Sequence, residues 1–171
     1  MNIRYLVVAL ALFLSAGCGY RAPGQGASWV GQQGRTLCVE LFANRTVEPY
    51  LDSVMTEEMS TQFSRSRLVE LVEDRARADL LFGGTVTAFE SRASAYGVND
   101  QITEYRATMT VRARLVRRDS GAVLWQEEIV RYETYPAMQD KSRQQEGESL
   151  AGRVVARRIA EDLYAHLLNA F

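Results

Sequence analysis

The strongest structural signal in this chain of 171 residues is a regular alternation of residue types along residues 102–117. Successive side chains of a β-strand point to opposite faces of a sheet, so this pattern predicts a long strand with one covered face. The covered face would hold Thr103, Tyr105, Ala107, Met109, Val111, Ala113 and Leu115. The opposite face would carry Arg106, Arg112 and Arg114.

Three further stretches have strand periodicity, namely residues 36–42, 80–93 and 122–135. The last of them follows residues 102–117 across Arg118-Asp119-Ser120-Gly121, which is typical of a hairpin turn. Paired glycines at positions 83 and 84 indicate a bulge or a close backbone approach. We expect one face of residues 80–93 to hold Leu80, Phe82, Val86 and Ala88.

The return strand, residues 122–135, carries large apolar side chains on both faces. Val123, Trp125 and Ile129 share one face, which favours core packing over contact with a partner. A further short strand is possible around Leu68 to Val72.

Two segments have helical periodicity. Residues 49–66 place Leu51, Met55, Met59 and Phe63 at every fourth position. After a polar stretch at 136–148, expected to be a loop, a second stripe holds Leu150, Val154, Val155, Ile159, Leu163, Leu167 and Phe171. The element order is therefore β-α-β-β-β-α. It predicts an α+β domain in which two amphipathic helices pack on one face of a mixed four-stranded sheet.

The N-terminus has the pattern of a secretory signal, with Arg4 before an apolar run and small residues at the end of that run. The run from Tyr5 to Leu14 is too short to span a bilayer. Cys18 follows Leu14-Ser15-Ala16-Gly17, and an ordinary signal has no use for a cysteine there. LSAGC resembles the bacterial lipobox, with Ser15 where leucine is usual. We therefore predict a lipoprotein signal peptide at 1–17 and lipidation of Cys18. The alternative is a plain secretory signal with a chance cysteine.

The rest of the chain is expected to form one tether and one domain. Residues 18–35 are rich in glycine, which is typical of a flexible tether. Residues 36–171 would form the single α+β domain. If Cys18 carries lipid, Cys38 has no cysteine left to pair with, so the fold would not depend on a disulfide.

Composition argues against several functions. A formal net charge of −1 gives no basic field for collecting nucleic acid. One histidine, His166, and no ligand spacing argue against a metal site. The chain has no phosphate-binding glycine loop followed by Lys-Ser or Lys-Thr, and no G-x-S-x-G motif. We therefore predict a protein that is not an enzyme and needs no cofactor. Its arginine row is either a solvated face balanced by Glu90 and Glu104 or a surface for phosphates or carboxylates.

Several short motifs, taken in order, resemble the lipopolysaccharide-assembly lipoprotein family LptE. They are Cys18-Gly19-Tyr20 and then V-E-L-F-A-N-R-T from Val39 to Thr46. Ala78-Asp79-Leu80 followed by Gly83-Gly84-Thr85-Val86, the strand Tyr105 to Leu115, the hairpin Asp119 to Trp125 and a closing amphipathic helix complete the resemblance. It covers essentially the whole chain.

The resemblance implies an outer-membrane lipoprotein of Gram-negative bacteria, folded as two helices on a four-stranded sheet. Such proteins plug the LptD β-barrel, help it to assemble, and with it place lipopolysaccharide in the outer leaflet. Members also bind lipopolysaccharide through basic side chains. Cys18 matches the lipid-bearing cysteine of the family, and Gly19 after it favours the outer membrane. Arg106, Arg112 and Arg114 are candidate contacts from alternation alone.

Two other functions remain open at the level of sequence. A lipoprotein regulator of a periplasmic peptidoglycan synthase would have the same anchor, but it usually needs a long tether. Here the tether of about 17 residues reaches at most about 60 Å, which favours a partner at the outer membrane. A free lipid carrier needs an apolar cavity, and the chain shows no surplus of apolar positions for one.

Overall fold

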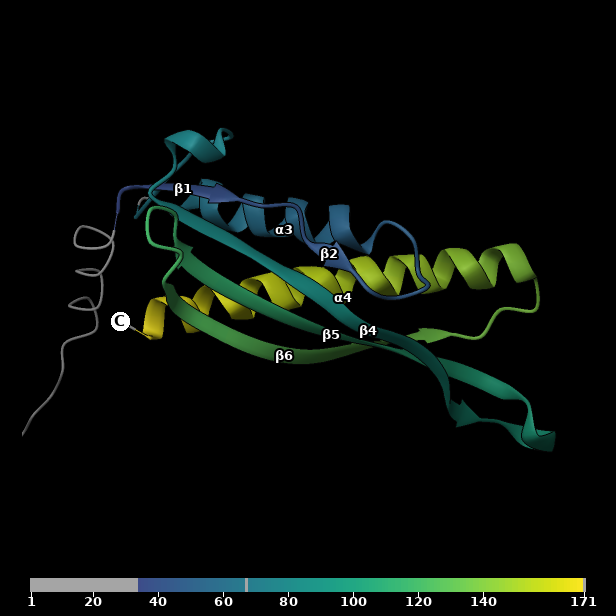
Figure 1. Ribbon diagram of the computed structural model, residues 1–171. Helices are drawn as coiled ribbons and strands as arrows, with labels where there is room; N and C mark the ends of the chain where they lie inside the picture. The colour runs from purple at the N-terminus through teal and green to yellow at the C-terminus, as the bar shows by residue number, and fades with distance from the viewer. Residues whose placement is uncertain (1–33, 67, 171) are drawn as a thin grey trace, which may run out of the picture.

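The computed structural model describes residues 34–66 and 68–170. The predicted signal peptide, Cys18 and nearly all of the predicted tether lie outside the described residues. Figure 1 shows both long helices on one face of a twisted sheet, which confirms the predicted α+β class. In chain order the elements are β1 (Thr36–Val39), β2 (Ala43–Asn44), α3 (Leu51–Arg65), β3 (Glu70–Leu71), η2 (Arg75–Arg77), β4 (Leu80–Tyr96), η3 (Val98–Asp100), β5 (Ile102–Arg117), β6 (Val123–Pro136) and α4 (Lys141–Asn169).

The sheet is mixed, as predicted, but it has six strands rather than four. Its order is β3-β1-β4-β5-β6, and β2 pairs with β4 farther along the same edge. The stretch 36–42 is not one continuous strand, because pairing with β4 stops after Val39 and resumes at Ala43. The possible strand near residue 70 is present as the two-residue β3.

A single inserted residue in β4 changes which of its side chains reach the core. The β4–β5 register is unbroken from Leu80 to Val86, skips Thr87, and resumes with Ala88 opposite Thr110. Ala88 therefore faces away from the helices with Thr110, and Phe89 packs against the core instead. The expected inner position of Ala88 is wrong, because a β-bulge reverses the alternation beyond it.

Of the paired glycines Gly83 and Gly84, the second marks a close approach between β4 and its neighbours, whereas the bulge lies farther along β4, between Val86 and Ala88. An ideal Cβ on Gly84 would lie 2.5 Å from both the Arg112 carbonyl oxygen and Cε1 of Phe42. Real Cβ atoms do not come so close, so only glycine fits between the Phe42 ring and β5.

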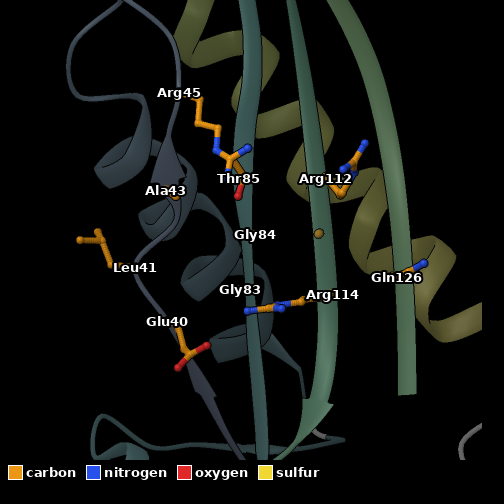
Figure 2. Close-up of a pocket in the computed structure, with 11 residues that line it drawn as sticks. Glu40, Leu41, Ala43, Arg45, Gly83, Gly84, Thr85, Arg112, Arg114 and Gln126 are labelled. Atoms are coloured by element: carbon orange, nitrogen blue, oxygen red, sulfur yellow. The ribbon is translucent and has the colours of Figure 1, made fainter. Parts of the chain in front are cut away.

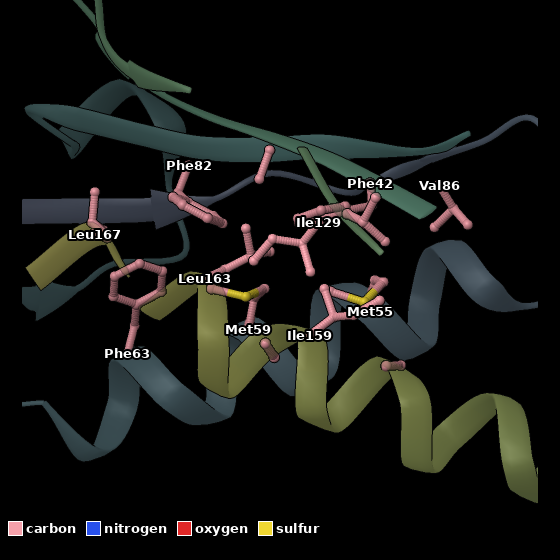
Figure 3. Close-up of a cluster of buried hydrophobic side chains, with 14 of the residues drawn as sticks. Phe42, Met55, Met59, Phe63, Phe82, Val86, Ile129, Ile159, Leu163 and Leu167 are labelled. Atoms are coloured by element: carbon pink, nitrogen blue, oxygen red, sulfur yellow. The ribbon is translucent and has the colours of Figure 1, made fainter. Parts of the chain in front are cut away.

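The core lies between the sheet and the helices and is built around aromatic rings from several elements (Figure 3). α3 contributes Leu51, Met55, Met59 and Phe63, as its spacing predicted. The ring centroid of Phe82 on β4 lies 5.0 Å from that of Phe63 and 6.2 Å from that of Trp125. Trp125 and Ile129 thus pack in the core, while Val123, expected on the same face, is exposed.

α4 is longer than its apolar period predicted. It begins at Lys141, inside the stretch 136–148 that was expected to be a loop. Oδ1 of Asp140 accepts a hydrogen bond from the Arg143 backbone N–H at 3.0 Å, which caps the helix. The first turns carry mostly polar side chains, so no apolar period reveals them. Leu150 and Val154 of the predicted stripe are exposed, and the buried stripe is Ala151, Gly152, Val155, Ala156, Ile159, Ala160, Leu163 and Leu167.

Three side-chain contacts join α4 to the edge strand β6, and two of them are ion pairs. His166 Nδ1 lies 2.7 Å from Glu127 Oε1, and Arg131 Nε lies 2.7 Å from Asp162 Oδ2. Arg158 pairs with Glu133. The helix residues are spaced by four and so lie on one face of α4. This seam sets α4 along the margin of the sheet.

Asp79 fixes the start of β1 beside the start of β4. Its Oδ2 accepts hydrogen bonds from the backbone N–H groups of Arg35 and Thr36 at 2.8 and 3.1 Å. These bonds favour the charged carboxylate and hold the pKa of Asp79 below its ordinary value.

We therefore expect Asp79→Asn to destabilise the protein at neutral pH by under about 1 kcal/mol, a small effect because Asp79 is exposed. A lowered native pKa gives stability that is fully present above the unfolded value of about 3.9 and is lost as pH falls through the native value. The difference between parent and variant should therefore vanish in strong acid. Urea unfolding followed by tryptophan fluorescence between pH 7 and pH 2 measures it; a difference that stays constant over this range would contradict the assignment.

Candidate functional site

The sheet face opposite the helices carries the predicted arginine row. Arg106, Arg112 and Arg114 all lie exposed on this open face of β5, in the alternation that the sequence predicted. Their surroundings differ, and neighbouring strands determine the difference.

Arg106 and Arg112 already have partners within the open face. Cζ of Arg106 lies 4.5 Å from the ring centroid of Tyr132, a cation–π contact. Nε and Nη2 of Arg112 donate to Oε2 of Glu128 at 3.1 and 2.7 Å. Arg114 makes no hydrogen bond or ion pair with any residue in 34–66 or 68–170.

Glu90 and Glu104, which were expected to balance the charge of the arginine row, have other partners. Glu90 pairs with Arg92 at 2.8 Å, and Glu104 accepts a hydrogen bond from the Ser94 hydroxyl at 2.7 Å. The row is therefore balanced only at Arg112, and by Glu128 on β6.

The open face holds two separate depressions that divide the row. The first, here called the arginine groove, has a volume of about 440 Å³ and is bordered by Arg45, Arg112, Arg114 and Gln126 around a floor of residues 83–85. The second, of about 410 Å³, contains Arg106 with Arg92 and Glu90. The three predicted arginines thus do not form one site.

Strand register explains the shape of the arginine groove. Gly83 lies directly opposite Arg114, and Thr85 lies opposite Arg112. Because Gly83 has no side chain, Arg114 can lie across β4 beside it, as Figure 2 shows. An ideal Cβ on Gly83 would come within 3.3 Å of the Glu40 side chain, so the floor there is narrow.

Arg45 completes the groove from the other side. It follows β2, and its backbone N–H donates to the Val86 carbonyl at 3.0 Å, which keeps the chain against β4. Figure 2 shows its guanidinium over Thr85. Arg45 was not among the predicted site residues, because in the sequence the segment around it shows only the end of a strand pattern. Arg45 reaches the arginine groove because β2, just before it, continues the pairing of β1 along the same edge of β4.

The arginine groove is positively charged within a chain of net charge −1. Glu40 at its border pairs with Arg75 at 3.2 Å, and Glu128 neutralises Arg112. Arg45 and Arg114 have no acidic partner among the residues that the structure describes. Two uncompensated guanidinium groups thus lie beside one floor.

The clearly raised pKa values in the described part of the chain belong to residues outside the arginine row. Burial is the main cause that raises the pKa values of Cys38, Tyr135 and Glu148. For Glu148 the nearby Glu48 adds to the effect. Within the described ranges, no group of three or more His, Cys, Asp or Glu residues is placed to hold a metal ion. No helix in the same part of the chain is long and apolar enough to cross a membrane.

Fold and site together define a class: a small α+β domain with two helices on one sheet face and an arginine-bearing open face on the other. The model of the LptE family, described as lipopolysaccharide-assembly, matches residues 34–167. The chain therefore belongs to the LptE family, and the resemblance seen in the sequence is confirmed. This is a family of outer-membrane-associated lipoproteins of lipopolysaccharide assembly, not of enzymes.

Solved structures share the fold at low sequence identity. A hypothetical protein from Chlamydia trachomatis has 12% identity and a TM-score of 0.55, covering 78% of this chain and 95% of that one. Uncharacterized lipoprotein B from Nitrosomonas europaea has 12% identity and a TM-score of 0.54, with coverages of 76% and 79%. Rare lipoprotein B from Shewanella oneidensis has 10% identity and a TM-score of 0.53, with coverages of 80% and 96%. A search of curated proteins gives no significant match.

Proposed function

We propose that this protein assembles with an LptD-type outer-membrane β-barrel, plugs its lumen, and supports transport of lipopolysaccharide to the outer leaflet. The match of the LptE family model to residues 34–167 carries the proposal, because it spans nearly the whole described domain. The two-layer fold agrees with it.

The shape and surface of the domain support a role inside a larger partner. β4 has 17 residues, so the sheet is about 55 Å long, elongated enough to fill a lumen. Apolar side chains are exposed at several places on it: Tyr96, Val98 and Ile102 near the β4–β5 turn, and Val123, Val130 and Tyr132 on β6. In the proposed complex these side chains contact the inner wall of the barrel.

The anchor is part of the proposal. Lipid on Cys18 would hold the domain at the outer membrane, on the periplasmic side or inside the barrel lumen, through a tether that reaches at most about 60 Å. Arg106, Arg112 and Arg114 are proposed to face lipopolysaccharide or the barrel. Arg114 is the most available of the three, because no described residue pairs with it.

The experiment is affinity purification of the tagged full chain from detergent-solubilised outer membranes. We expect a large β-barrel to co-purify in a stoichiometric amount. A Cys18→Ala variant should be lost from the outer-membrane fraction, because it cannot carry the lipid. Depletion of the protein should remove folded barrel and surface lipopolysaccharide together.

Two results would count against the proposal. One is recovery of the protein with no barrel. The other is recovery of a peptidoglycan synthase instead, which would favour the regulator hypothesis.

A further inference from the structure

We propose that two copies of this chain pair antiparallel through the outer edges of their β6 strands, with a twofold axis at Ile129. The two sheets then form one continuous sheet. Some of the same β6 side chains belong to the proposed barrel contacts, so the dimer is a form of the chain that is free of a barrel. The dimer itself does not rest on the proposed function.

The first support is the open edge of β6. The sheet ends at this strand, and no other strand in the part of the chain that the structure describes pairs with its outer side. Its pairing with β5 has no bulge from Trp125 to Pro136, and proline occurs only as the last residue of the strand. Unpaired N–H and C=O groups along such an edge are a template for another strand. By contrast, the free part of β4 beyond β2 is interrupted by bulges after Val86 and Ala93.

The second support is a charge pattern that complements itself. In an antiparallel pair, residues directly opposite each other share a face, and opposite charges there attract. When Ile129 lies opposite its own copy, Glu127 lies opposite Arg131 of the second copy. Twofold symmetry gives this attractive pair twice.

The same charges exclude the neighbouring registers that keep both pairs of helices on one side. An axis at Glu128 would place this carboxylate opposite its own copy. An axis at Val130 would place Glu127 opposite Glu133. Like charges directly opposite each other are unfavourable. The axis at Ile129 is therefore the favoured one of the three.

The paired charges are already held in position by α4. Glu127 Oε1 lies 2.7 Å from His166 Nδ1, and Arg131 Nε lies 2.7 Å from Asp162 Oδ2. The second carboxylate oxygen of Glu127 and Nη2 of Arg131 make no hydrogen bond with other described residues. Nη1 of Arg131 donates to the Val130 carbonyl at 2.9 Å. Each side chain thus keeps a polar atom for the second copy.

Pairing also covers apolar side chains of the open face. Val130 and Tyr132 are 50% and 54% exposed on this edge strand. In the register centred on Ile129 they lie opposite Glu128 and Gln126 of the second copy. The aliphatic stems of these two polar residues can pack on Val130 and Tyr132.

The test is sedimentation equilibrium of the full chain in density-matched neutral detergent, with micelles in large excess over protein. We expect a reversible equilibrium between monomer and dimer that depends on protein concentration. A chain that stays monomeric up to about 100 μM would overturn the proposal.

Single charge reversals test the register. Glu127→Arg sets two pairs of like charges across the axis, and Arg131→Glu does the same with the opposite sign. Each should raise the dissociation constant of the dimer by at least about tenfold. Arg153→Glu, a matched reversal at an exposed position of α4, should stay within about twofold of the parent. Unchanged association of both β6 variants would overturn the proposed interface.

An equal mixture of the two β6 variants separates contacts between copies from contacts within one copy. In a mixed dimer one pair across the axis is native and the other has its charges exchanged, so both pairs attract. We expect the mixture to dimerise within about threefold of the parent, although neither variant does so alone. If the reversals act only through the lost contacts with α4, mixing recovers nothing, and that result would overturn the register. Barrel recovery with the parent chain tests the proposed function separately, so either proposal can fail alone.

Discussion

Replacing Phe82 with alanine is expected to lower the free energy of unfolding by about 3–5 kcal/mol. Phe82 is fully buried, and its ring lies 5.0, 6.2 and 6.3 Å, between centroids, from those of Phe63, Trp125 and Phe42. One side chain of β4 therefore joins α3, β6 and the segment after β1. Its removal would leave a cavity at the point where the layers meet, and packed aromatic contacts would be lost with it.

Urea unfolding followed by circular dichroism measures this loss. Tyr96→Ala is the matched control, because Tyr96 is an aromatic residue of the same strand that is 64% exposed. Its effect should stay within about 0.5 kcal/mol. Equal effects of the two substitutions would mean that the Phe82 ring is not a central packing element.

Gly84→Ala should destabilise the protein by at least about 2 kcal/mol, although it adds only one methyl group. The new Cβ would lie 2.5 Å from the Arg112 carbonyl oxygen and 2.5 Å from Cε1 of Phe42. The carbonyl belongs to a paired strand and cannot move without loss of β4–β5 pairing. The cost is steric overlap and not backbone strain, because Gly84 has no positive φ.

The neighbouring glycine supplies the control for this prediction. A Cβ on Gly83 would meet the Glu40 side chain at 3.3 Å, and that flexible side chain can shift. Gly83→Ala should therefore cost less than about 1 kcal/mol. Adding Phe42→Leu to Gly84→Ala should recover part of the loss, and a double-mutant cycle measures the coupling. Simple additivity would show that the Phe42 ring is not what excludes a side chain at Gly84.

Helices and strands with one buried and one exposed face were predictable from the sequence, because apolar residues recur along them with the period of the helix or strand. α3 matches its predicted face residue by residue, and β5 does so from Tyr105 to Leu115, whereas Thr103 of the predicted covered face is exposed. The bulge at Thr87 was not predictable, because pairing with a distant strand decides where β4 gains a residue. The first turns of α4 were missed for a different reason: their side chains are mostly polar, and only the cap at Asp140 marks the start.

The candidate site was predictable only in part. Alternation placed Arg106, Arg112 and Arg114 on one face, and they lie there. It gave no information on the neighbours that contact Arg106 and Arg112, because Tyr132 and Glu128 come from β6. Arg45 belongs to a segment far away in sequence, which reaches the groove only because β2 pairs with β4.

The pairing of β1 has a mechanical consequence for a chain held by its N-terminus. β1 lies between β3 and β4 and is parallel to both. Tension on the residues before Gly34 acts along the strand, so the hydrogen bonds on both sides of β1 share the load in shear. They would not open one after another, as in the peeling of an edge strand. The load passes from β1 into β4 and through it into the long antiparallel β4–β5–β6 meander.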